Sequence, residues 1–260
     1  MAAVRRLRSL SAHLPVVPNR SAGTLAGSQQ TSYPKRKIFA CGAGPSSDTP
    51  WLRDQIIAAS GKASPKVVWM GTPSYDGREG AAGFAEAGLE VEWLNVTDLE
   101  ALPSAESIAT TLRSADIIQV SGGNTLFAVR RWRNLGVDKL LHEAMERGCV
   151  LCGGSAGCIC WFDGGHSDSL APSTVHPDHR KELTEDERLD WSYCRVKGLG
   201  FIDAFCCPHH NQHERHSTVS RAEHFDGLLR MSPGEVGLGV DNDACFVVEG
   251  DSWRGTLHAA

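Results

Sequence analysis

GCVLCGGSAGCICWF, residues 148–162, places a serine among small residues between two apolar runs. The first run, Cys149–Cys152, predicts a buried strand, and Ala156–Phe162 is expected to start a helix. Between them, the turn around Ser155 has the G-x-S-x-G pattern of a nucleophile elbow. Small neighbours let such a turn lift the serine hydroxyl out of the sheet, and N–H groups at the helix start face a developing oxyanion. A tight packing turn with an unused hydroxyl is the alternative interpretation.

Strands and helices alternate on both sides of this stretch. Buried strands are expected at Lys37–Cys41, Lys66–Met70, Glu90–Leu94, Asp116–Val120 and, beyond the elbow, in the apolar run Gly200–Cys207. Amphipathic helices are expected at Trp51–Ala59, Glu79–Ala87, Ser104–Ser114, Thr125–Arg133 and Val137–Arg147. Continuous apolar strands alternating with amphipathic helices predict an α/β fold with a mainly parallel sheet covered on both faces.

In sheets of this kind, function gathers at the carboxyl ends of the strands. Two Gly-rich segments follow expected strands, the elbow at Ser155 and the sequence SGGN at 121–124. A serine nucleophile needs a base, and the base needs an orienting partner. His209 is the candidate base, because it follows an apolar run and Pro208 at an expected strand end.

Two acids lie close behind the serine, Asp163 and Asp168. Asp168 belongs to the segment Gly165–Ser169, which is expected to be a loop. A carboxylate on a loop could reach across to an imidazole and orient it. Asp168 is therefore the first candidate for the orienting acid, and Asp163 is the second.

Four segments resemble the peptidase E family of serine peptidases, which includes aspartyl dipeptidases and is related to cyanophycinases. They are SGGNTL (121–126), GGSAGCICWF with the following GHSDS (153–169), GLGFIDAFCCPHH (198–210) and GLGVDNDA (237–244). The resemblance runs from about Lys37 to the C-terminus. It implies a three-layer α/β sandwich like that of the class I glutamine amidotransferases, which is flavodoxin-like.

The resemblance also implies roles for individual residues. Ser155 would be the nucleophile, His209 the base and Asp168 the acid, without a metal or another cofactor. The oxyanion hole would be formed by the backbone of Gly122, Gly123 and Asn124 together with the Ala156 N–H. Arg215 is a candidate partner for a substrate carboxylate, because a guanidinium offers a bidentate match. The implied reaction is hydrolysis of short peptides, dipeptides with an N-terminal aspartate in particular.

Composition limits the partners that this chain can have. The net charge is −5, but residues 1–47 hold seven basic residues and no acid, so the remainder carries −12. Such an acidic body argues against nucleic acid as a partner, and no apolar run reaches the length of a membrane span. A small peptide is the expected partner, and the oligomeric state stays open, with a homodimer among the choices.

The nine cysteines are odd in number and mostly embedded in apolar runs. This pattern is typical of buried thiols in a reducing compartment, which predicts a cytoplasmic protein. Residues 1–35 are rich in Ser, Ala and Arg and are expected to be a disordered or targeting extension, with an organelle matrix as the location if they are a transit peptide. Residues 36–260 are expected to form one α/β domain.

Several rival readings concern the same residues. Cys149 and Cys152 have the spacing of a redox motif, although they lie in an expected strand. A zinc site is the rival reading of a segment whose thiols and imidazoles are Cys206, Cys207, His209, His210, His213 and His216. An α/β-hydrolase esterase shares the elbow and the Ser–Asp–His order, but no HGGG-type oxyanion loop precedes Ser155. A non-catalytic binding module would be marked by loss of the nucleophile or the base, and neither is missing.

Overall fold

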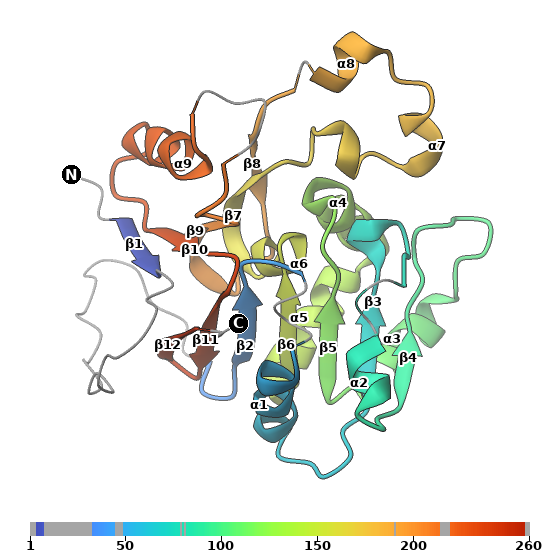
Figure 1. The fold of residues 1–260 in the computed structure, drawn as a ribbon. Helices are drawn as coiled ribbons and strands as arrows, with labels where there is room; N and C mark the ends of the chain where they lie inside the picture. The colour runs from blue at the N-terminus through green and yellow to red at the C-terminus, as the bar shows by residue number, and fades with distance from the viewer. Residues whose placement is uncertain are drawn as a thin grey trace.

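The computed structural model describes residues 4–7, 33–44, 49–78, 80, 82–189, 191–213 and 219–257. Its main sheet has the strand order β12-β11-β2-β6-β5-β3-β4, shown in Figure 1. The five strands from β2 to β4 are parallel, whereas β11 runs antiparallel to both β2 and β12. Their bounds are β2 (Lys37–Cys41), β3 (Val67–Met70), β4 (Val91–Trp93), β5 (Ile117–Val120), β6 (Val150–Gly154), β11 (Ala244–Glu249) and β12 (Ser252–Leu257).

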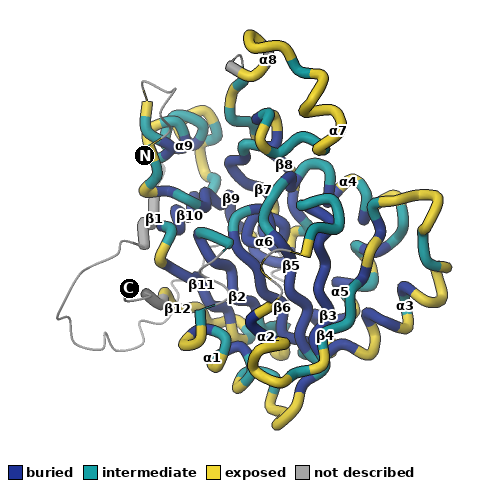
Figure 2. The backbone as a smooth tube through the Cα atoms, turned by 45° about the vertical axis from the view of Figure 1, so that its right-hand side comes forward, coloured by how far each residue is buried: buried dark blue, intermediate teal, exposed yellow. Residues whose placement is uncertain are grey.

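Helices cover both faces of this sheet, because its central strands are apolar and buried at nearly every position. In β2, Ile38 and Ala40 belong to one buried cluster and Phe39 and Cys41 to another, as the alternation of side chains along a strand requires. The first cluster includes buried residues of α3 (Ala105–Ser114), α4 (Thr125–Leu135) and α5 (Val137–Arg147). The second includes residues of α1 (Pro50–Ser60) and α2 (Ala82–Glu86). The predicted three-layer α/β sandwich is confirmed, and Figure 2 shows its strands as the buried centre.

A second sheet follows the elbow. Its order is β1-β10-β9-β7-β8, and all its neighbours are parallel except β7 and β8. The bounds are β1 (Val4–Leu7), β7 (Phe162–Ser167), β8 (Cys194–Lys197), β9 (Ile202–Pro208) and β10 (Gly237–Val240). One face is covered by α9 (Arg221–Arg230), whose Phe225 and Leu229 pack with Phe205 and Cys207 of β9.

The segment after Ser155 differs from two expectations. Helix α6 spans only Ala156–Ile159, and the strand β7 already begins at Phe162, so the expected helix 156–162 is too long. Residues 165–167, expected to be in a loop, continue this strand. The physical reason is that the apolar run 158–162 carries the chain from the first sheet into the interior of the second. There β7 pairs with both β9 and β8, and these bonds replace helical hydrogen bonds.

The structure describes only part of the N-terminal extension, residues 1–35. Val4–Leu7, inside the extension expected to be disordered or targeting, forms β1 and pairs with β10. Most of that extension lies outside the described residues, so its role stays a prediction. Across the described ranges, no helix is both long and apolar enough to span a membrane.

All nine cysteines are thiols outside any disulfide, and all but Cys194 are buried. Burial raises the pKa of Cys149 to about 12, so this thiol stays protonated at neutral pH. Cys152 has no exposed surface. Reactive thiolates need a lowered pKa and access, so the redox reading of this pair finds no support.

Candidate active site

Ser155 occupies a strained turn between β6 and α6. Its φ of 57° and ψ of −115° lie in a region that residues other than glycine rarely adopt. All its neighbours from 150 to 162 are buried, whereas Ser155 itself is partly exposed. Strain that lifts one hydroxyl out of a buried run is the geometry that a nucleophile elbow requires.

Close backbone packing explains the glycines of the turn. A Cβ at Gly154 would overlap the carbonyl oxygen of Ala43, which follows β2. Only glycine lets these two backbones approach so closely. The turn therefore lies against the carboxyl end of β2, in the middle of the main sheet.

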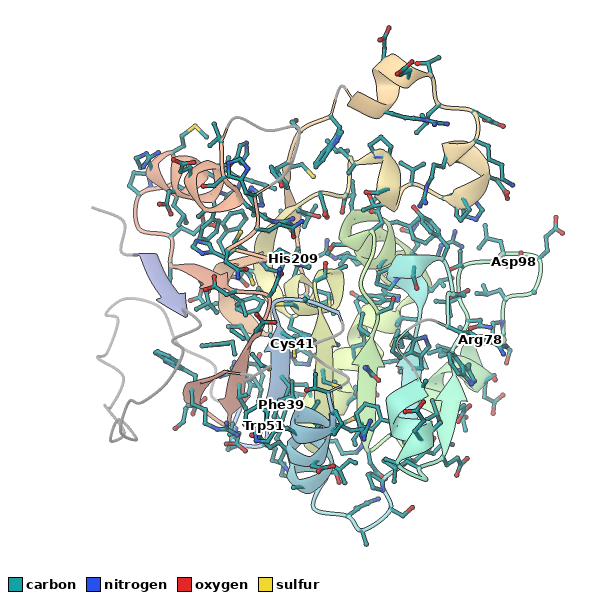
Figure 3. The ribbon with its side chains drawn as sticks, viewed as in Figure 1. Phe39, Cys41, Trp51, Arg78, Asp98 and His209 are labelled. Atoms are coloured by element: carbon teal, nitrogen blue, oxygen red, sulfur yellow. The ribbon has the colours of Figure 1, made fainter. Side chains whose placement is uncertain are left out.

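His209 is brought to this place by the same strand end. The Ser155 N–H donates to the carbonyl of Cys41 at 3.2 Å, and the His209 N–H donates to the carbonyl of Gly42 at 3.2 Å. Ser155 follows β6 of the main sheet and His209 follows β9 of the second sheet. Their N–H groups nevertheless donate to carbonyls of two consecutive residues, Cys41 and Gly42. Figure 3 shows His209 just beyond the Cys41 end of β2. The sequence prediction that these two residues meet at strand ends is consistent with this placement.

The imidazole of His209 has a partner that sequence reasoning missed. His209 Nδ1 lies 2.6 Å from Asn242 Oδ1. An amide oxygen only accepts, so Nδ1 carries the hydrogen in this pair and Nε2 is the unprotonated ring nitrogen. Asn242 follows β10, and its N–H donates to Asn211 Oδ1 at 2.9 Å. Polar residues directly after the apolar run 236–240, at another strand end, were the signal that could have identified it.

Neither predicted acid occupies that position in the described contacts. Asp168 Oδ2 lies 3.6 Å from Arg221 Nη1. Asp163 is the second residue of β7, at the opposite end of that strand from Ser167 and Asp168. Partial burial and the neighbouring carboxylate of Asp203 raise the pKa of Asp163 to about 6. Asn242 is thus the side chain that the structure places beside this imidazole nitrogen, and a catalytic role for Asp168 or Asp163 stays a prediction.

The SGGN segment lies beside the serine. A Cβ at Gly122 would be 3.5 Å from the Cβ of Ser155, so this backbone borders the hydroxyl. Gly123 has a φ of 124°, and a Cβ there would overlap the carbonyl oxygen of Pro73. In the part of the chain that the structure describes, the N–H groups of Gly122, Gly123 and Ala156 have no hydrogen-bond partner. These three donors are the groups available for an oxyanion.

Asn124 has a different role from the predicted one. Its N–H donates to the Pro73 carbonyl at 2.7 Å. Its Oδ1 caps α4 by accepting from the Phe127 N–H, and its Nδ2 donates to the carbonyls of Ser169 and Thr174. The residue anchors the N-terminus of α4 to the segment after β7, so its hydrogen bonds are used within the protein.

Two predictions fall wholly or partly on residues that are not described. Arg215 and His216 lie in the segment 214–218, outside the described residues. Within the described part of the His-rich segment, Cys206 Sγ lies 3.5 Å from Cys158 Sγ, and His210 Nδ1 lies 3.4 Å from Asp241 Oδ1. No three metal-binding side chains gather in a suitable cluster among the residues that the structure covers.

A cavity of about 810 Å³ opens next to the SGGN segment. Its walls come from the segments after β3 and β4, from the start of α4 and from the η3–α7 region, where η3 is Pro172–Thr174 and α7 is Pro177–Arg180. Its polar and aromatic residues include Tyr75, Asp76, Asn124, Phe127, Arg131 and His176. Tyr75 and Asp76 both have positive φ, another strained stretch at a strand's carboxyl end. A volume of this size is typical of small-ligand sites.

Comparison with known proteins identifies the family of this chain. The model of Peptidase family S51 matches residues 38–256. The uncharacterized peptidase YgaJ of Bacillus subtilis (strain 168) is 28% identical over 179 residues, which cover 68% of this chain and 69% of that protein. Peptidase E of Pasteurella multocida (strain Pm70) is 32% identical over 109 residues, 42% of this chain and 44% of that protein.

Two solved structures share the fold. A peptidase from an acI-B1 Actinobacterium superposes with a TM-score of 0.61 at 18% identity, covering 86% of this chain and 88% of that one. A protein from Listeria monocytogenes EGD-e, assigned to peptidase E, gives a TM-score of 0.58 at 18% identity, with 86% and 99% covered. Because the family model spans most of the chain, this protein belongs to peptidase family S51, the serine peptidases that include peptidase E.

Proposed function

We propose that this protein hydrolyses short peptides with a free N-terminus, dipeptides beginning with aspartate in particular, through an acyl-enzyme on Ser155. The observation that carries the proposal is the pairing of the strained Ser155 with His209 on consecutive carbonyls of one strand end. A packing turn would need neither the strained hydroxyl nor an imidazole anchored beside it.

In the proposed reaction, Ser155 Oγ attacks the scissile carbonyl while His209 Nε2 takes the hydroxyl proton. Asn242 holds the imidazole in the tautomer that leaves Nε2 basic. The N–H groups of Ala156 and Gly122 face the oxyanion of the tetrahedral intermediate. His209 then gives its proton to the leaving amine, and water attacks the acyl-enzyme by the same route.

The preference for an acidic first residue rests on the resemblance to peptidase E and on electrostatics. The chain after residue 47 carries −12, so an acidic substrate would be repelled unless the pocket held a fixed cation. Arg215 lies six residues after His209 and is the proposed cation. Arg221, the next arginine, is almost completely buried against Asp168 and is a poorer candidate.

A panel of Asp-Xaa, β-aspartyl, Ala-Xaa and Xaa-Pro dipeptides tests the proposal. Wild-type protein should hydrolyse Asp-Xaa best, and Ser155→Ala should lower kcat at least about 10³-fold with an unchanged fold. Cys158→Ala, a change to a buried thiol beside the elbow, is the matched control and should keep most activity. Prolonged dialysis against a strong chelator should leave the rate unchanged, because serine and histidine supply the nucleophile. Near-normal turnover by Ser155→Ala would exclude the proposed mechanism.

A further inference from the structure

Asp168 leaves its strand at the level of the proposed base. Strands β7 and β9 are parallel neighbours, with Gly165 opposite Cys206. Continued along both strands, this register sets Asp168 level with His209, the first residue after β9. Paired strands lie about 4.8 Å apart. Asp168 therefore borders the catalytic position without being the partner of His209 Nδ1, a place that Asn242 holds.

The backbone of Asp168 is fixed, whereas its carboxylate is partly open. The Asp168 carbonyl accepts from the Ala171 N–H at 2.7 Å and from Thr174 Oγ1 at 3.1 Å. The side chain is 26% exposed, and the 3.6 Å to Arg221 is too long for a direct hydrogen bond. Among the described residues, no donor forms a hydrogen bond with this carboxylate. The carboxylate therefore has acceptor capacity that the described residues do not use, and part of it is open to solvent.

Arg221 is the cation that lies beside this carboxylate. The guanidinium is 1% exposed, begins α9 and lies over the ring of Tyr193 at 4.8 Å. Cys207 is a side-chain partner of this guanidinium, but its buried Nε and Nη2 have no hydrogen-bond partner among the described residues. A buried cation this poorly satisfied needs a nearby anion, because an unpaired buried charge is strongly destabilising. Arg221 therefore acts as a positioning residue that holds the Asp168 side chain in place.

We infer that Asp168 binds the α-ammonium group of the substrate and so makes the enzyme an exopeptidase that requires a free N-terminus. This inference rests on the proposed function. The chemistry is a charge-assisted hydrogen bond from an ammonium to a carboxylate that has unused acceptors. Asp168 lies one residue beyond the end of β7, at the level of His209. Its carboxylate is therefore in place to bind the N-terminal residue of the substrate, whose carbonyl carbon Ser155 attacks.

The inference predicts a selective defect in Asp168→Asn. For Asp-Leu, kcat/KM should fall about 10- to 150-fold, mostly through KM, because one charge-assisted contact is lost. For the N-acetylated peptide, a poor substrate of the wild type, kcat/KM should not change. The rate at which an alkyl fluorophosphonate labels Ser155 should also be unchanged, since that probe has no ammonium group.

A pH profile separates recognition from a structural role. The α-amino group of a peptide loses its proton near pH 8. In wild-type protein, KM for Asp-Leu should therefore rise about tenfold per pH unit above that value. In Asp168→Asn, KM should be nearly flat over the same range, because the interaction that depends on the proton is gone.

Removing Asp168 alone leaves Arg221 buried without an anion, and that variant could fail to fold. The double variant Asp168→Asn, Arg221→Met removes both charges and keeps the buried volume filled; it should show the same selective loss. An equal loss on free peptide, blocked peptide and fluorophosphonate would overturn the inference alone and restore Asp168 to the triad. A wild type that hydrolyses neither peptide would overturn the proposed function and this inference with it.

Discussion

At the residue scale, the proposed mechanism gives a separate role to each of three side chains. Ser155 is held in a strained conformation, His209 is anchored one carbonyl away, and Asn242 accepts from the imidazole. An amide fixes the tautomer of a histidine, but unlike a carboxylate it adds no negative charge to stabilise the imidazolium. Asn242 therefore orients the imidazole of His209, the proposed base, but contributes no charge to it.

Substitution of Asn242 tests this division. Asn242→Leu should lower kcat about 10²-fold or more, because the imidazole loses its orientation. Asn242→Asp should keep the orientation and add a charge that raises the pKa of His209. Since the base must be neutral, the acidic limb of the kcat/KM profile should move to higher pH. An unchanged profile in Asn242→Asp together with full activity in Asn242→Leu would remove Asn242 from the mechanism.

Arg215 is the residue on which the proposed specificity depends. Arg215→Met should reduce kcat/KM for Asp-Leu about 10- to 150-fold, the range of one bidentate contact with a carboxylate. Hydrolysis of Ala-Leu should change little, and Arg230→Met, at the far end of α9, is the matched control. Equal losses on both dipeptides would make Arg215 a structural residue.

At the scale of elements, the site depends on strand ends that approach more closely than side chains allow. Gly154 at the end of β6 lies against Ala43, and Gly123 after β5 lies against Pro73. Each contact ties a proposed catalytic or oxyanion segment to a neighbouring strand end. The positions of the site residues are therefore set by the packing of neighbouring strand ends and not by the conformation of one loop.

A single methyl group tests this packing. Gly154→Ala should lower the free energy of unfolding by about 3 kcal/mol and abolish activity, because the new Cβ overlaps the Ala43 carbonyl. Gly227→Ala is the matched control: it lies within α9, and its Cβ would meet only the end of the Arg230 side chain, at 3.8 Å. There alanine should stabilise by about 0.5–1 kcal/mol. Urea unfolding curves measure both values, and equal stability of the two variants would contradict the packing argument.

The sequence predicted local elements better than it predicted where they meet. Apolar runs such as Lys37–Cys41 define strands by composition, and the elbow pattern identifies Ser155 without long-range information. The second sheet was missed because strand pairing is a property of distant segments. Asn242 was missed for the same reason: it lies 33 residues after His209, and only the pairing of β10 with β9 brings it to the base.

At the scale of the whole molecule, we expect stability to fall in acid, and His166 is one specific source of that loss. His166 in β7 has no exposed surface, and burial, with Arg221 and His224 nearby, lowers its pKa to about 2. The folded protein therefore keeps this imidazole neutral, whereas the unfolded chain protonates it below about pH 6.5. Its contribution to stability is complete above that value and is lost progressively as pH falls toward the folded pKa.

Replacing His166 should reveal its contribution to the pH dependence of the free energy of unfolding. Between about pH 7 and pH 5, His166 should account for a loss of about 2 kcal/mol in the free energy of unfolding. In His166→Asn that part of the pH dependence should disappear, so the difference between the two urea curves isolates it from other groups such as Asp163. Parallel pH dependence in the two proteins would show that His166 titrates normally.

The central claim is that Ser155 is a nucleophile activated by His209, and covalent labelling tests it most directly. Wild-type protein treated with an alkyl fluorophosphonate should gain one adduct per chain, located by peptide mass mapping at Ser155. Ser155→Ala should gain none, and His209→Gln should react at least about 10²-fold more slowly. A wild type that gains no adduct, or a Ser155→Ala variant that keeps it, would contradict the account and leave this fold a binding module.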